Sequence, residues 1–145
     1  MPGGTVRALA KTKYTFTSLS TGAGVEVVIA KGLDVSAYPE ATLLARLHAK
    51  NISPNTGTWT VKLILRPDAP TPDDPASEWT QLTVTDLATV TFDKNSSVGA
   101  FDLQKISSAN AFGGWLKLIL KPTQSATTPE SPFEITVSAD IIVKS

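Results

Sequence analysis

The residue types that usually carry catalysis are scarce in this chain. Its 145 residues include one histidine, His48, and no cysteine. A Ser-His-Asp triad needs its histidine beside a nucleophile and a carboxylate, and no GxSxG segment is present to supply the nucleophile. The lack of cysteine excludes thiolate catalysis and cysteine-ligated zinc. We therefore expect a protein that is not an enzyme and that needs no cofactor.

Acidic side chains gather in a loop rather than in a catalytic pair. Asp68, Asp73, Asp74 and Glu78 fall in or beside the proline-rich segment 67–75. Carboxylate oxygens are the ligands that Ca²⁺ prefers, but the DxDxDG spacing of a calcium loop is missing. Because Asp is favoured in turns for its local hydrogen bonds, we interpret this segment as a solvated acidic loop. We therefore expect no metal site in this loop. The alternative interpretation is that its carboxylates bind an ion.

Basic side chains alternate along two neighbouring segments. Residues 43–50 and 58–66 both alternate apolar with polar positions, which predicts strands. The turn-forming residues 53–57 lie between them, so we expect a β-hairpin. On its outward face we count five basic side chains and no carboxylate, and we predict that this face is an interface for an acidic surface. The outward residues are Arg46, His48, Lys50, Thr60, Lys62, Ile64 and Arg66.

The charge of the chain is divided along its length, although the net charge is zero. Residues 1–66 hold eight Lys or Arg and three Asp or Glu, whereas residues 67–145 hold five and ten. Contact between identical subunits would therefore match the basic face to Asp73 and Asp74, and such head-to-tail contacts close rings or extend lattices. The balanced total disfavours nucleic acid as a partner.

One short pattern occurs twice. The sequence KLILRP at 62–67 returns as KLILKP at 117–122, and a tryptophan precedes each copy. Equivalent strands of a pseudo-symmetric sandwich would need the same pattern, and a duplication is the alternative. The spacing places Trp59 in the core and Trp115 outward beside Ile119, where the pair forms a candidate contact patch. Alternatively, Trp115 lies at a strand end under a loop.

The elements that position these residues are short strands. Thr and Val alternate with other residues through most of the chain, and ten prolines and nine glycines divide it into segments. This pattern predicts an all-β, antiparallel β-sandwich of jelly-roll type with about nine strands. The expected strands are 13–19, 25–30 (ended by a turn at 31–32), 43–50, 58–66, 79–84, 88–92, 99–104, 115–121 and 133–143.

The domain organisation is expected to be simple. Pro2, Gly3 and Gly4 predict a flexible N-terminal arm over residues 1–11, followed by a single sandwich domain over residues 12–145. The N-terminus lacks the apolar stretch of a signal peptide. No run approaches the roughly 20 apolar residues of a membrane span. We therefore expect a soluble protein without a membrane partner.

In its length, arm, Thr- and Val-rich strands and lack of cysteine, the chain resembles small β-sandwich virion proteins of tailed phages, such as head decoration (cement) proteins and related tail components. This resemblance implies a structural protein that assembles with itself or with a capsid or tail shell. It implies a location in the virion after assembly in the host cytoplasm, with contacts through residues 1–11, the basic face and Trp115. The alternative is a carbohydrate-binding module with a glycan partner, which predicts a row of exposed aromatics such as Trp115 and Trp79.

Overall fold

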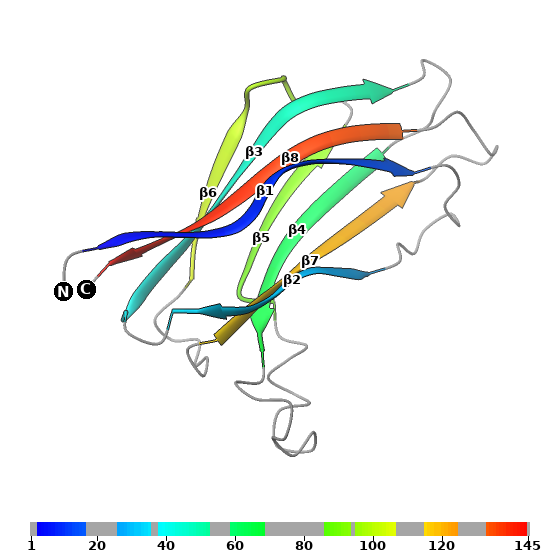
Figure 1. Cartoon of the computed structure of the whole chain (residues 1–145). Coiled ribbons are helices and arrows are strands. Elements are labelled where there is room, and N and C mark those ends of the chain that lie inside the picture. Colours follow the sequence, from blue (N-terminus) through cyan, green and yellow to red (C-terminus); the bar gives the residue numbers. More distant parts are fainter. Residues whose placement is uncertain are drawn as a thin grey trace.

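The computed structural model describes residues 3–16, 26–35, 38–52, 59–68, 86–93, 95–106, 115–124 and 133–144. These residues form two four-stranded antiparallel sheets (Figure 1). Sheet A has the order β1-β8-β3-β6 and sheet B the order β2-β7-β4-β5. The predicted antiparallel jelly-roll sandwich is thereby confirmed. The eight strands are β1 (Gly4–Phe16), β2 (Val27–Asp34), β3 (Glu40–Ile52), β4 (Trp59–Pro67), β5 (Ala88–Asp93), β6 (Phe101–Lys105), β7 (Trp115–Gln124) and β8 (Phe133–Lys144).

Alternating apolar residues build the core between the two sheets. Side chains of a strand point to opposite faces in turn, so every second residue faces the other sheet. In β3 and β8 of sheet A these residues are fully buried, as are their counterparts in β4 and β7 of sheet B. Burial of each large aliphatic side chain stabilises the fold by about 1.5–3 kcal/mol. The central residues are Leu43, Leu47, Leu63, Leu65, Leu116, Leu118, Leu120, Ile135 and Ile141.

The prediction that residues 43–50 and 58–66 form a hairpin is wrong. Both segments are strands, but β3 pairs with β8 and β6, whereas β4 pairs with β7 and β5. The chain therefore crosses from sheet A to sheet B between β3 and β4 (Figure 1). Alternation fixes which residues of a strand face the core, and it is the same whether the next strand lies in the same sheet or in the opposite one.

The repeated pattern places its two copies side by side. β4 and β7 are antiparallel neighbours, with Leu63 opposite Leu120, Ile64 opposite Ile119 and Leu65 opposite Leu118. The three aliphatic residues of one copy thus lie opposite the same residue types in the other. The pairing also sets Lys62 opposite Lys121 and Arg66 opposite Lys117, and like charges directly opposite each other destabilise a sheet.

The expected N-terminal arm is mostly a strand. β1 begins at Gly4, so residues 4–11 pair with β8 instead of projecting from the domain. The register shifts between Arg7 and Leu9 and again before Thr12. These bulges break the period-two pattern, which explains why the pattern indicated a strand only from residue 13. Gly3 serves close packing here, because a Cβ atom at this position would lie 2.5 Å from the carbonyl oxygen of Val143.

The turn expected at residues 31–32 lies inside β2. The pairing with β7 shifts register between Ala30 and Leu33, and Gly32 has a φ of 62°. The Gly32 N–H donates a hydrogen bond to Oδ2 of the buried Asp68, at 2.9 Å. The glycine thus marks a bulge that bends the strand, which is a second common use of this residue in sheets.

Substitution Gly32→Ala is expected to lower the free energy of unfolding by about 1 kcal/mol, because a Cβ atom disfavours this left-handed backbone conformation. No steric clash contributes, since a Cβ atom at this position would meet no other atom within 4 Å. Urea unfolding followed by circular dichroism measures the change. Gly4→Ala is the matched control, because Gly4 has equal space without a positive φ. Equal stability of the two variants would contradict a strained backbone at Gly32.

Candidate functional site

The predicted basic face is divided between the two sheets. Arg46 and His48 lie on the outer face of sheet A, whereas Lys62, Ile64 and Arg66 belong to β4 in sheet B. A single five-cation surface therefore does not form, because β3 and β4 are not neighbours. Its role as an interface stays a prediction for each half separately.

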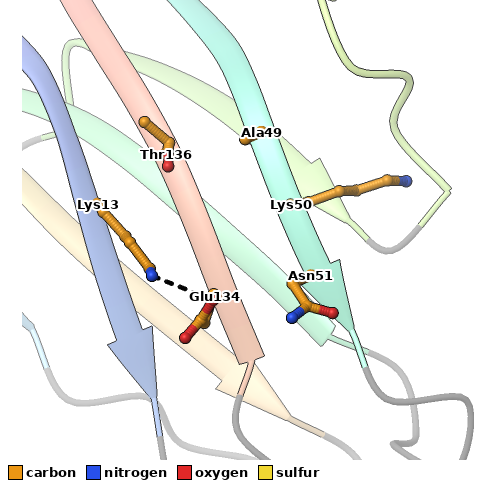
Figure 2. A pocket seen from close by; sticks show the side chains of 6 residues that line it. All are labelled: Lys13, Ala49, Lys50, Asn51, Glu134 and Thr136. Atoms are coloured by element: carbon orange, nitrogen blue, oxygen red, sulfur yellow. Dashed lines mark ion pairs between the residues drawn. The ribbon is translucent and has the colours of Figure 1, made fainter.

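Lys50 departs from the predicted face for a local reason. The register with β8 shifts between Leu47 and Ala49, so Ala49 lies opposite Thr136 and Lys50 opposite the buried Ile135. One extra residue in a strand turns all later side chains to the other face. Figure 2 shows the Lys50 side chain extending away from Lys13.

A shallow pocket of about 180 Å³ lies at one end of sheet A (Figure 2). The Nζ atom of Lys13 and Oε2 of Glu134 are 3.3 Å apart in an ion pair there. Lys13 is paired with Thr136 across β1 and β8, which sets both side chains on the same face. The lining offers hydrogen bonds to a small polar group, and its one carboxylate is already paired with a lysine. The lining residues are Lys13, Ala49, Lys50, Asn51, Glu134 and Thr136.

His48 is half-buried and bonded rather than free on the surface. Its Nε2 atom lies 2.8 Å from Oγ of Ser138, on the neighbouring strand β8. The contact resembles a nucleophile with its base, but Ser138 is buried and offers little room for a substrate carbonyl. The next carboxylate on that face, Asp140, lies 2.7 Å from Nε of Arg7. The arrangement fits a structural hydrogen bond between β3 and β8.

Sheet B carries the best-formed polar cluster among the described residues. Arg66 donates two hydrogen bonds to the carboxylate of Glu26, at 2.7 and 2.8 Å, and its Nε donates to Asp86 at 2.7 Å. Lys121 lies 3.7 Å from the same Glu26. These carboxylates offset the like charges that the β4–β7 pairing sets against each other. Strand periodicity does not reveal them, because they are 40 and 20 residues from Arg66 along the chain.

The cluster shifts the pKa values of its members. The pKa of Glu26 is lowered from 4.5 to about 2, chiefly by the hydrogen bond from Arg66, while the charges of Arg66 and Lys121 add to the shift and burial opposes it. The pKa of Arg66 is raised, chiefly by its hydrogen bond to Glu26. The short, bidentate geometry is the kind in which an arginine–carboxylate pair is strongest.

Acid is expected to weaken the fold through Glu26. A carboxyl whose folded pKa lies below its unfolded value contributes stability above pH 4.5, and this contribution is lost as the pH falls toward about 2. The side chain is 38% exposed, so solvent screening reduces the effect to about 1 kcal/mol. Urea unfolding at about pH 6 and about pH 3 should show a larger loss in the wild type than in Glu26→Gln. Parallel losses in both proteins would contradict this.

The predicted patch of Trp115 and Ile119 is not an open surface. Ile119 and its cross-strand neighbour Ile64 are each 2% exposed. Trp115 is half-buried at the start of β7, and its carbonyl oxygen accepts a hydrogen bond from the N–H of Asp68 at 2.9 Å. The prediction that Ile119 lies on the outward face of its strand was correct, but the face on which a side chain lies does not determine how exposed it is. The side chain of Trp59, as well as Asp73, Asp74 and Trp79, lies outside the described residues.

Exposed apolar side chains occupy two edge strands instead. Within the described residues, large hydrophobic side chains at least 45% exposed occur only at β2 and in β6 with its preceding turn. The guanidinium carbon of Arg46 lies 5.6 Å from the centre of the Phe101 ring. Periodicity does not distinguish edge strands from central ones, so no local pattern marked these positions. They are Val27 (48%), Val28 (45%), Val98 (58%), Phe101 (59%) and Leu103 (48%).

Clusters of metal-ligating side chains, and helices long and apolar enough to span a membrane, do not occur in the described ranges. Nowhere in them do three or more His, Asp or Glu side chains come together as a metal site requires. The same part of the chain contains no helix long and apolar enough to cross a membrane. Among its aromatic side chains of known burial, Phe101 alone is exposed, so a flat aromatic row is not seen there.

No family model and no curated protein matches the sequence. The fold matches that of viral capsid proteins. The VP2 subviral particle of infectious bursal disease virus gives a TM-score of 0.51 at 12% identity over 98% of this chain, which spans about a third (32%) of that VP2 chain. The empty capsid of Triatoma virus gives 0.48 at 11% identity, covering 97% of this chain and 87% of that one. Turnip yellow mosaic virus gives 0.35 at 19% identity, covering 100% and 94%.

The VP2 match shows a viral-capsid-like β fold. The expected resemblance to virion proteins is confirmed at this level of the fold. The finer resemblance to decoration proteins of tailed phages stays a prediction.

Proposed function

We propose that this chain is a non-enzymatic structural subunit of a virion, which assembles with itself or with a capsid shell, as a decoration protein or a related component. The supporting observation is the fold match to VP2 across 98% of the chain. Eight-stranded jelly rolls recur in viral shells. Because one fold can serve unrelated functions, assembly itself has to be measured.

The surface of the chain agrees with such a role. Phe101 and Leu103 are exposed side by side on one face of the edge strand β6, and Val27 and Val28 are exposed on the edge strand β2 of the other sheet. Contiguous exposed apolar groups on a soluble protein commonly mark contact with another protein. In this proposed role the chain binds other protein subunits and is located in the virion.

Size-exclusion chromatography with light scattering, followed by electron microscopy of the peak fractions, tests the proposal. We expect oligomers or closed particles whose share rises with protein concentration. A glycan array run on the same preparation tests the carbohydrate-binding alternative. A chain that stays monomeric at every concentration and binds a glycan would overturn the structural role.

A further inference from the structure

One ion pair of sheet B reaches across a whole strand. β7 lies between β2 and β4 (Figure 1). Arg66 belongs to β4 and Glu26 stands directly before β2, yet two hydrogen bonds of 2.7 and 2.8 Å join their side chains. The pair therefore spans the outer face of β7. In sheet A, by contrast, the ion pair Lys13–Glu134 joins β1 to β8, which are direct neighbours.

The strand register shows which residue lies beneath this bridge. Arg66 is opposite Lys117 on β7. At the other end of the bridge, Oε1 of Glu26 lies 3.7 Å from Nζ of Lys121. Because side chains alternate between the faces of a strand, Ile119 is the residue between these two lysines on the outer face of β7. The bridge from Arg66 to Glu26 therefore passes over Ile119.

The burial of side chains on this face agrees with a cover. Ile119 and its cross-strand neighbour Ile64 point outward, but each is only 2% exposed. The Arg66 side chain is itself 11% exposed, although arginines mostly lie open to solvent. An arginine that lies flat along a sheet covers apolar surface with its methylene stem while its charged end stays bonded. Val28, which pairs with Ile119 from the edge strand β2, is 45% exposed, so the cover ends at β7.

We propose that the Arg66 side chain is a strap, held by Glu26 on one side and by Asp86 on the other, that keeps the centre of this outer face closed. Its Nε donates to Asp86, just before β5, at 2.7 Å. Release of Glu26 opens the strap, because Asp86 then draws the guanidinium toward β5 and away from Ile119. The open face presents Ile119 and Val28 as one apolar surface across β7 and β2. This device goes beyond the proposed structural role and does not depend on it.

Cysteine labelling measures the cover directly, because the chain has no cysteine of its own. The reporter Ile119→Cys is treated with a maleimide, and its modification is followed by mass spectrometry with and without the second substitution Glu26→Gln. We expect Glu26→Gln to raise the labelling rate at least about tenfold, because the rate follows the population in which the site is open. Ile64→Cys is a second reporter with the same expected result, so the test does not depend on the folding of one variant. Far-ultraviolet circular dichroism checks that each variant is folded.

Two controls separate opening of the strap from weakening of the whole fold. Leu118→Cys places the reporter in the core, on the opposite face of the same strand. Glu26→Gln should raise its labelling rate much less than that of Ile119→Cys. Glu134→Gln removes the ion pair between the directly paired strands β1 and β8 of sheet A, and it should leave the labelling of Ile119→Cys unchanged.

Three results would overturn the strap. An equal rise for Ile119→Cys and Leu118→Cys means that Glu26 acts only on global stability. A labelling rate of Ile119→Cys that Glu26→Gln does not change means that another part of the molecule covers this position. A rise with Glu134→Gln as large as that with Glu26→Gln means that the effect is not specific to the bridge across β7. None of these results depends on whether the chain forms oligomers, so the strap and the proposed function can fail separately.

Discussion

Replacement of Leu63 by alanine is expected to lower the free energy of unfolding by about 3 kcal/mol. Leu63 is fully buried in β4, between Val90 of β5 and Leu120 of β7. The change removes apolar contacts and leaves a cavity that strands held on both sides cannot close. In a protein of this size the loss is a large share of the total stability.

Equilibrium unfolding in urea, followed by far-ultraviolet circular dichroism, measures this change. Leu103→Ala is the matched control, because Leu103 is the same residue type at a half-exposed edge position. It should cost less than about 1 kcal/mol. Similar losses for the two variants would show that the core does not lie where the structure places it.

Reversal of the charge at Arg66 is expected to lower the free energy of unfolding by about 2 kcal/mol. The Arg66 side chain is 11% exposed, and its guanidinium holds Glu26 and Asp86 together. In Arg66→Glu three carboxylates would meet at this point, with Lys121 as a nearby cation. The partial exposure of the two acidic partners keeps the cost below that of a fully buried pair.

The same unfolding measurement should show a change within about 0.5 kcal/mol for Arg46→Glu, whose side chain is exposed on the other sheet. The swapped pair Arg66→Glu with Glu26→Arg should recover part of the loss. Equal effects of Arg46→Glu and Arg66→Glu would contradict the division of the predicted basic face. Loss of assembly in a variant that includes Arg66→Glu would therefore report on folding as well as on contacts.

The different behaviour of Arg46 and Arg66 illustrates the limit of strand patterns. Both follow the same alternation, which predicts one outward face for the two of them. The structure separates them because β3 and β4 pair in different sheets. It also brings Glu26, the residue just before β2, to Arg66 from a distant part of the chain. Pairing partners depend on the whole arrangement of strands, which local periodicity does not contain.

The amino-acid pattern by itself determined the all-β class, the position of most strands and, for most of their length, the inward faces of β3, β4 and β7. These follow from the period of two and from proline and glycine at the breaks, which are local properties. Only the tertiary structure decided which strands are edges, and hence that Phe101, Leu103, Val27 and Val28 are exposed whereas Ile64 and Ile119 are buried. Exposure is set by the neighbours that long-range pairing brings to a residue, and a sequence pattern specifies only the side of the strand on which that residue lies.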